Sequence, residues 1–145
     1  MASGIYEKWK QNLLSSSTNS NSTLNGTGTI GVYAALIDRD TGYTDGILNF
    51  STNQYYSEIA SYIQGTPVEL TGKTFTNGVF DANDAVFTNV SGNTIEAVLI
   101  YRRNTSSNNT WELVALIDSE DLSPASVTPD GTVTIMWNNS GIFKL

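Results

Sequence analysis

Residues 94–118, TIEAVLIYRRNTSSNNTWELVALID, decide the fold class of this chain. Two runs rich in apolar, β-branched and aromatic residues, 94–103 and 110–118, flank the polar loop 104–109. Hydrophobic residues alternate along each run, and the first run carries apolar residues on both of the faces that this alternation defines. Apolar residues on both faces are typical of central strands that are covered from both sides. We therefore predict that the two runs are antiparallel neighbours in the middle of a sheet, with Leu99, Trp111 and, further along the chain, Trp137 largely buried.

Weaker strand signals lie on either side of this stretch. Residues 29–37 alternate, with Ile30 and Val32 on one face, and Asn77-Gly78 is a strong hairpin signal. Turn signals recur at spacings of roughly eight to twelve residues, which favours an all-β, antiparallel β-sandwich of the Ig-like or jelly-roll-like kind. The sandwich domain is expected to span residues 29–145. Further strands are expected at 68–70, 73–76, 79–80, 85–90, 132–137 and 142–145, and a short helix at 54–63.

The N-terminal region has a different pattern. Residues 3–14 suit a short amphipathic helix with Ser3 as N-cap, and its apolar stripe consists of Ile5, Tyr6, Trp9 and Leu13. Residues 15–28 are uncharged, of low complexity and typical of a flexible tether. We predict that residues 1–28 form a helix and arm, and that the stripe binds a partner. Two arrangements are open, because the helix can pack on its own sheet or dock on another molecule.

Composition excludes several classes of function. The chain has no cysteine and no histidine, which rules out disulfides, cysteine nucleophiles, Ser-His-Asp triads and zinc sites built from thiolate or imidazole. A net charge of −7 disfavours nucleic acid as a partner, and the one adjacent basic pair, Arg102-Arg103, is expected at the solvated end of a strand. The longest apolar run, 97–101, is too short to cross a membrane, and the N-terminus lacks the apolar core of a secretory signal.

Several carboxylates are candidate metal ligands or catalysts. Asp38, Asp40 and Asp45 surround a glycine-containing loop, but Gly42 and Asn49 stand where a calcium loop needs ligands. Glu96 and Glu112 would suit a glycosidase if they were paired across strands, although exposed outward-facing glutamates are more typical. We therefore predict no catalytic residue, no metal and no cofactor, and expect that the chain is not an enzyme.

Residues 72–145 contain a succession of short motifs. They are GVFDA (78–82), VFT (86–88), SGN (91–93), EAVLIY (96–101), LID (116–118), VTPDG (127–131), TIMW (134–137) and GIFKL (141–145). This succession resembles a family of small β-rich structural proteins of tailed bacteriophages. The resemblance implies a non-enzymatic virion protein, assembled in the host cytoplasm, and either a capsid decoration (cement) protein or a minor tail component. It brings no catalytic residues with it.

Two functions therefore compete. A decoration protein would be a homo-oligomer that binds the major capsid protein or other virion proteins, with the N-terminal helix tying subunits together. A tail or tail-fibre module would instead bind a host receptor or glycan through aromatic side chains such as Trp111, Trp137 and the tyrosines Tyr55, Tyr56 and Tyr62. Packing in the core or at an interface is the more common role of such aromatic residues.

Overall fold

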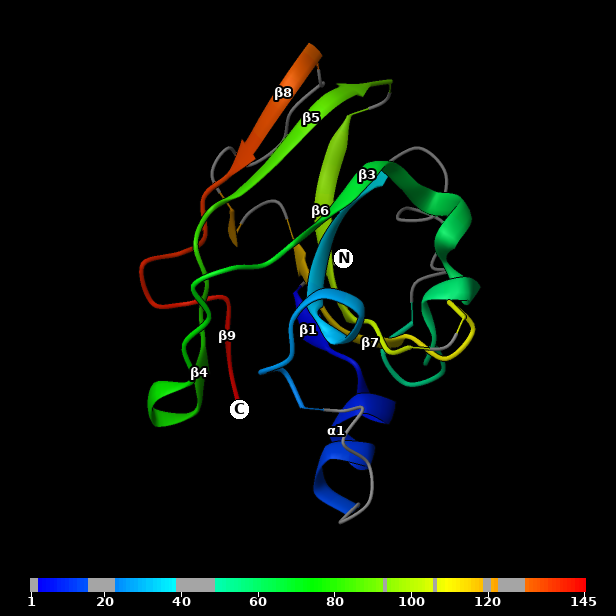
Figure 1. The fold of residues 1–145 in the computed structure, drawn as a ribbon, viewed down its shortest axis with the longest axis vertical. Helices are drawn as coiled ribbons and strands as arrows, with labels where there is room; N and C mark the ends of the chain where they lie inside the picture. The colour runs from blue at the N-terminus through cyan, green and yellow to red at the C-terminus, as the bar shows by residue number, and fades with distance from the viewer. Residues whose placement is uncertain are drawn as a thin grey trace.

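A computed structural model of the chain describes residues 3–15, 23–38, 49–92, 94–105, 107–118, 121–122 and 130–145. The protein is mostly β, with one five-stranded antiparallel sheet, two two-stranded antiparallel sheets and one short N-terminal helix (Figure 1). The strands are β1 (Gly4–Ile5), β2 (Val32–Asp38), β3 (Ile63–Glu69), β4 (Val79–Phe80), β5 (Ala85–Ser91), β6 (Ile95–Arg102), β7 (Glu112–Asp118), β8 (Asp130–Ile135) and β9 (Phe143–Lys144). The α-helix is α1 (Glu7–Ser15), and short 3-10 helices are η2 (Gly28–Ile30), η4 (Tyr56–Glu58), η5 (Ala60–Tyr62) and η6 (Thr76–Gly78).

The main sheet has the strand order β1-β7-β6-β2-β3. Its centre confirms the prediction for residues 94–118, because β6 and β7 are antiparallel neighbours with Leu99 opposite Leu116. Both faces of β6 are buried, as apolar residues at consecutive positions require. Leu99 is fully buried and Trp137 is buried, as predicted, whereas Trp111 is only half-buried because it precedes β7 at the end of the sheet.

The two small sheets pair strands that are far apart in sequence. β5 pairs with β8, and β4 pairs with β9. One face of the β5–β8 ladder is buried, with Phe87 and Val133 in the core, while Val86 on the opposite face is half exposed. This ladder lies beside the edge strand β3, where the Gln64 side chain donates a hydrogen bond to the Ser91 carbonyl at 2.7 Å.

The Asn77-Gly78 turn forms, but the expected two-residue hairpin does not. Asn77 (φ 56°) and Gly78 (φ 78°) both take the left-handed conformation, and the Val79 amide donates to the Thr76 carbonyl. The strands beyond the turn then separate, because Val79 and its neighbour Phe80 pair with β9 instead. Residues 73–76 keep a single antiparallel bridge, between Thr74 and Asp81.

Two other expectations need correction. The strand predicted over 29–37 begins only at Val32, because Gly28 (φ 63°) starts a 3-10 turn that leaves Ile30 exposed. The short helix predicted over 54–63 is two 3-10 helices, and Ile63 already belongs to β3. Its first turn is capped by Glu58, whose carboxylate accepts the Tyr55 amide at 2.7 Å.

The N-terminus closes the outer edge of the main sheet. Gly4 and Ile5 pair with β7, and the Tyr6 amide donates to the Val114 carbonyl. Ser3 is therefore not the N-cap of the helix, which begins at Glu7. Its hydroxyl instead accepts the amide of Asp118, in the last position of β7. The helix packs on its own chain, which is one of the two arrangements left open by the sequence; residues 16–22 of the predicted tether lie outside the described residues.

Candidate interaction site: an apolar pocket beside the N-terminal helix

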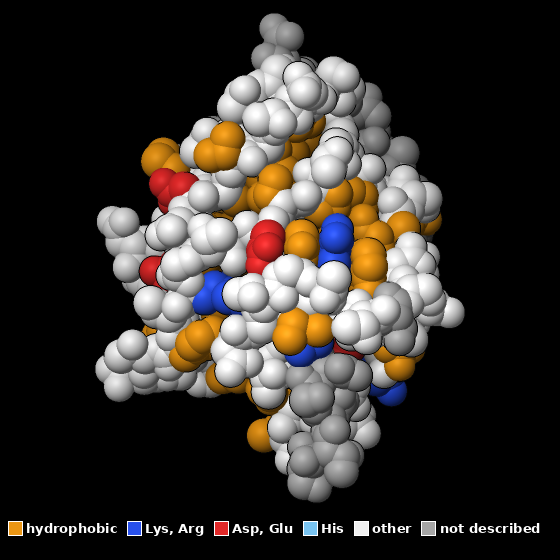
Figure 2. Space-filling view, viewed as in Figure 1, with side chains coloured by type: hydrophobic (Ala, Val, Ile, Leu, Met, Phe, Trp, Pro, Cys, Tyr) orange, Lys and Arg blue, Asp and Glu red, His pale blue; other side chains and the backbone are white. Residues whose placement is uncertain are grey.

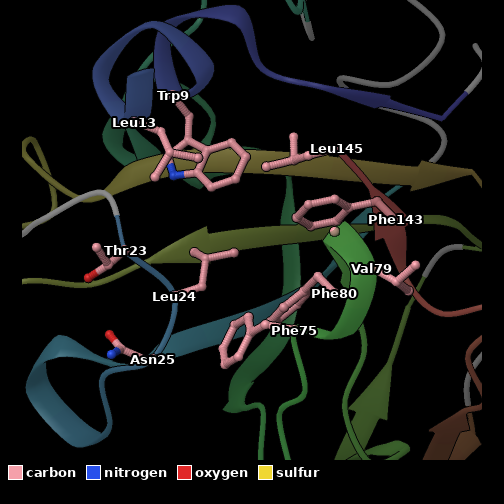
Figure 3. Close-up of a pocket in the computed structure, with 11 residues that line it drawn as sticks. Trp9, Leu13, Thr23, Leu24, Asn25, Phe75, Val79, Phe80, Phe143 and Leu145 are labelled. Atoms are coloured by element: carbon pink, nitrogen blue, oxygen red, sulfur yellow. The ribbon is translucent and has the colours of Figure 1, made fainter. Parts of the chain in front are cut away.

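An apolar pocket of about 390 Å³ lies between α1, the chain around Leu24 and the β4–β9 ladder (Figure 3). Figure 3 shows side chains entering it from the helix on one side and from the C-terminal strand on another. No lining side chain is charged. The lining residues are Trp9, Leu13, Thr23, Leu24, Asn25, Phe75, Gly78, Val79, Phe80, Phe143 and Leu145.

A chain of aromatic contacts fixes the walls. The Trp9 ring meets the Phe143 ring edge to face, with centroids 5.9 Å apart. The ring centroids of Phe143 and Phe80 are 5.2 Å apart, and those of Phe80 and Phe75 are 5.7 Å apart. Edge-to-face and tilted contacts at these distances favour one arrangement of the rings. The pocket walls are thus built from residues that are far apart in sequence and held by one another.

Polar contacts anchor the wall formed by residues 23–28. The Arg102 Nε donates to the Thr23 carbonyl at 2.6 Å, and the Gly28 amide donates to the Glu69 carboxylate at 2.8 Å. The Lys73 ammonium group also donates to the carbonyl of residue 26. Desolvation on burial lowers the pKa of both Arg102 and Lys73 from their usual values, so holding these cations here has a cost that the hydrogen bonds to carbonyl oxygens offset.

Large apolar side chains project at the rim of the pocket. Phe75 is 48% exposed and Leu145 is 57% exposed, although both line the pocket. Leu14 follows the lining residue Leu13 along α1 and is 86% exposed. Figure 2, in the same orientation as Figure 1, shows that hydrophobic side chains reach the surface on this face of the molecule, with basic and acidic side chains beside some of them. An uncharged hollow with an apolar rim suits an apolar side chain of a partner.

The structure divides the predicted stripe between three positions. Trp9 and Leu13 line the pocket. Ile5 lies in β1 opposite Ala115. Tyr6 is fully buried away from the pocket, with its ring 5.1 Å from Phe50. Burial, with a smaller contribution from Glu58, raises the pKa of Tyr6 far above its usual value, and its hydroxyl has no hydrogen-bond partner among the described residues. That the stripe binds a partner stays a prediction.

Sequence reasoning missed most of the other pocket residues. Leu24 had a usable signal, because it is the one apolar residue in the uncharged stretch 15–28, and it is buried. Phe75 and Phe143 had none, since each belongs to an ordinary short strand pattern. The long-range pairing of β4 with β9 places Phe143 beside both Trp9 of the helix and Phe80, against which Phe75 packs.

The other candidate chemistry does not assemble in the described part of the chain. Glu112 pairs across β6–β7 with Arg102 rather than Glu96, and it is buried, where its carboxylate accepts a 2.7 Å hydrogen bond from Asn12. Among the described residues no group of acidic side chains suits a metal ion, but Asp40 and Asp45 lie outside them. No described helix has the length and apolarity to cross a bilayer. No protein-family model matches the chain, and no curated protein matches its sequence.

Proposed function

We propose that this chain is a capsid decoration protein of a tailed bacteriophage, which stabilises the head shell through contacts between subunits. The observation that carries the proposal is the uncharged apolar pocket with the exposed rim residues Phe75 and Leu145. The assignment to a tailed bacteriophage, and to its particle, rests on the resemblance of residues 72–145 to phage structural proteins. Apolar surface left open to water is typical of a protein that completes its contacts in an assembly.

The pocket would receive an apolar side chain of the major capsid protein or of a neighbouring copy. Burying apolar surface contributes about 25 cal/mol per Å², so covering Phe75, Leu145 and the pocket floor would stabilise a modest contact. On a repeating shell, a subunit held at one point meets its second contact at a high effective concentration. A modest pocket contact would then suffice for firm attachment.

We also propose that the three sheets together form a sandwich. The alternation of buried and exposed residues in β5 and β8 supports a small sheet that presents one face to the core. Contacts between β3 and β5 support a continuous connection from the main sheet into the second layer. The Ig-like or jelly-roll-like topology remains part of this proposal.

A tail or tail-fibre module that binds a receptor or glycan is the second candidate. The observation that favours it is a cluster of half-buried aromatic side chains, Tyr33 and Trp111, at the end of the main sheet. Copy number separates the two functions. Quantitative mass spectrometry of purified virions should find copies in proportion to the shell subunits for decoration, and a much smaller number for a tail module.

Binding to the shell provides the direct test. The full chain is mixed with phage heads that lack it, and the bound fraction is measured by co-sedimentation. Phe75→Ser and Leu145→Ser should each weaken binding by about tenfold or more, because a lost large apolar contact costs about 1.5–3 kcal/mol. Both variants should melt close to the unmodified chain, since the two side chains are about half exposed.

Val86→Ser is the matched control, because Val86 is 49% exposed but lies on the β5–β8 ladder outside the pocket. It should bind as the unmodified chain does. Failure of the unmodified chain to bind any head preparation would contradict the decoration proposal. Equal binding by all three variants would show that the pocket is not the surface that binds the shell.

A further inference from the structure

Three aromatic rings form a row across three strands at one end of the main sheet. Tyr33 on β2 and Tyr101 on β6 are opposite each other, with ring centroids 5.9 Å apart and planes 27° apart. Trp111, just before β7, continues the row at 6.0 Å from Tyr101 and 19° from its plane. Side chains two residues apart on a strand share a face, so Arg103 lies beside Tyr101. Its guanidinium carbon lies 3.8 Å from the centre of the Tyr33 ring and 4.5 Å from that of Trp111.

The hydrogen bonds of Arg103 leave one edge of its guanidinium group open. Nε and Nη2 both approach the Tyr101 hydroxyl, at 3.4 Å and 3.0 Å. A guanidinium group carries five N–H donors, so the edge formed by Nη1 and the outer hydrogen of Nη2 remains. Within the described ranges no carboxylate or carbonyl accepts from that edge. An edge with two parallel N–H donors of this kind can meet a carboxylate with two hydrogen bonds.

The neighbouring Arg102 shows what an arginine with a structural role looks like here. It is 3% exposed, and its guanidinium group donates to the Thr23 and Arg103 carbonyls. The expected solvated basic pair is therefore wrong for Arg102. Arg103 is instead half-buried, and its guanidinium group is stacked on aromatic rings and, among the described residues, donates only to the Tyr101 hydroxyl.

We propose that Arg103, held between Tyr33 and Trp111, binds the carboxylate of an acidic saccharide. The stacked rings hold the planar group in place before the ligand arrives, which lowers the entropy lost on binding. The adjoining loop, residues 104–110, is built wholly from Asn, Thr and Ser, and of its described residues, 105 and 107–110 are exposed. Exposed hydroxyl and amide groups beside a fixed cation suit the hydroxyls and the carboxylate of such a sugar.

This site is separate from the apolar pocket, because none of the pocket-lining residues belongs to it. The net charge of −7 repels anions at long range, so attraction has to come from the local contact. Binding is therefore weak and sensitive to salt. The proposal also holds for a decoration protein, and its outcome leaves the shell-binding test of the pocket unaffected.

The full chain is titrated with glucuronate, with glucose as the uncharged control and sodium chloride added to keep ionic strength equal. NMR chemical shifts of the Trp111 indole N–H and the Arg103 Nε–H, together with tryptophan fluorescence, report binding. Saturable shifts at both groups with glucuronate, and none with glucose, are expected. Arg103→Lys keeps the charge but loses the two parallel hydrogen bonds, so it should bind about tenfold or more weakly.

Lys144→Gln is the matched control, because it removes one exposed positive charge elsewhere and should leave the titration unchanged. Circular dichroism and melting confirm that each variant is folded. The proposal is overturned if glucuronate produces no saturable shift, if glucose produces the same shift, or if folded Arg103→Lys binds as tightly as the unmodified chain. A short glutamate peptide that binds as tightly as glucuronate would overturn the assignment to a saccharide.

Discussion

The centre of the main sheet and the β5–β8 ladder use the same kind of residue in opposite ways. In β7, every residue from Glu112 to Asp118 is buried. In β5, buried residues such as Phe87 alternate with exposed ones such as Val86. The first pattern requires cover on both sides, whereas the second presents one face to the core and the other to the outside.

The comparison distinguishes the residues that stabilise the fold from those that are available for contacts with other molecules. Removing a side chain from the two-sided centre leaves a cavity that the surroundings fill only partly. Removing one from the outer face of a ladder costs little, so that face is free to vary. The apolar pocket belongs to neither region, because it lies between the helix, residues 23–25 and the β4–β9 ladder.

The largest effect is expected at the helix α1, which packs against β7 and places Trp9 against Phe143 of β9. Trp9 is 1% exposed, so Trp9→Ala should lower the free energy of unfolding by about 3–5 kcal/mol, measured by urea denaturation. Leu14→Ala, on the same helix but 86% exposed, should change it by less than about 0.5 kcal/mol. Equal effects of the two substitutions would show that the helix does not contribute to the core.

The next largest effect is expected between the centre of the main sheet and the outer face of the β5–β8 ladder. Leu99 lies in β6 and is fully buried, so Leu99→Ala should cost about 2–5 kcal/mol. Val86→Ala on the outer face of β5 should cost about 0.5 kcal/mol or less. Thermal and chemical denaturation of both variants give the two values, and a Val86→Ala cost as large as that of Leu99→Ala would break the comparison.

Two glycines with similar positive φ angles extend the comparison to the two small ladders. Gly141 has φ 104°, and an added Cβ would lie 2.3 Å from a methyl carbon of Val79. Gly131 has φ 100°, but an added Cβ would meet nothing within 4 Å. Both alanine substitutions incur backbone strain of about 1–3 kcal/mol, and Gly141→Ala adds a collision. Its melting temperature should therefore fall further, and equal shifts would contradict the packing of β4 against β9.

Alkaline pH should affect the main sheet through its buried tyrosines. Burial raises the pKa of Tyr6 and of Tyr101 well above the usual value near 10. Because the folded state holds these protons more tightly, the contribution to stability is complete below pH 10 and is lost as pH rises above it. The loss is up to about 1.4 kcal/mol per pH unit for each group. Denaturation between pH 9 and 11 measures it, and Tyr6→Phe should reduce the slope.

Local patterns predicted the parts of the fold that depend on neighbours in sequence. The β6–β7 pair follows from alternation on both sides of one short loop, and Asn77-Gly78 forms its turn because both residues tolerate positive φ. The partner of β4 could not be predicted in this way. Phe80 pairs with Phe143 across most of the C-terminal half of the chain, and no local preference specifies that choice.

The residues of the candidate sites also divide into those that local sequence patterns predict and those that they do not. Helical spacing identified Trp9 and Leu13, which line the pocket, because residues four apart share a face of a helix. The predicted stripe also included Tyr6, but the Tyr6 side chain lies in the core against Phe50. No sequence pattern around Phe50 predicts this contact. The open edge of Arg103 was beyond reach, since it depends on which acceptors lie within hydrogen-bonding distance in three dimensions.

The pairing of Gly4 with Leu116 also sets an order of events in time. A ribosome adds about 5–20 residues per second, so the first strand waits roughly 6–20 seconds before its partner has been made. During that interval β7 does not exist, and the amphipathic helix that follows β1 lacks the strand on which it packs. Closing so long a loop is also slow in refolding, because its entropy is lost before the contacts form. Gly4 and Ile5 are therefore among the last residues of this fold to reach their place.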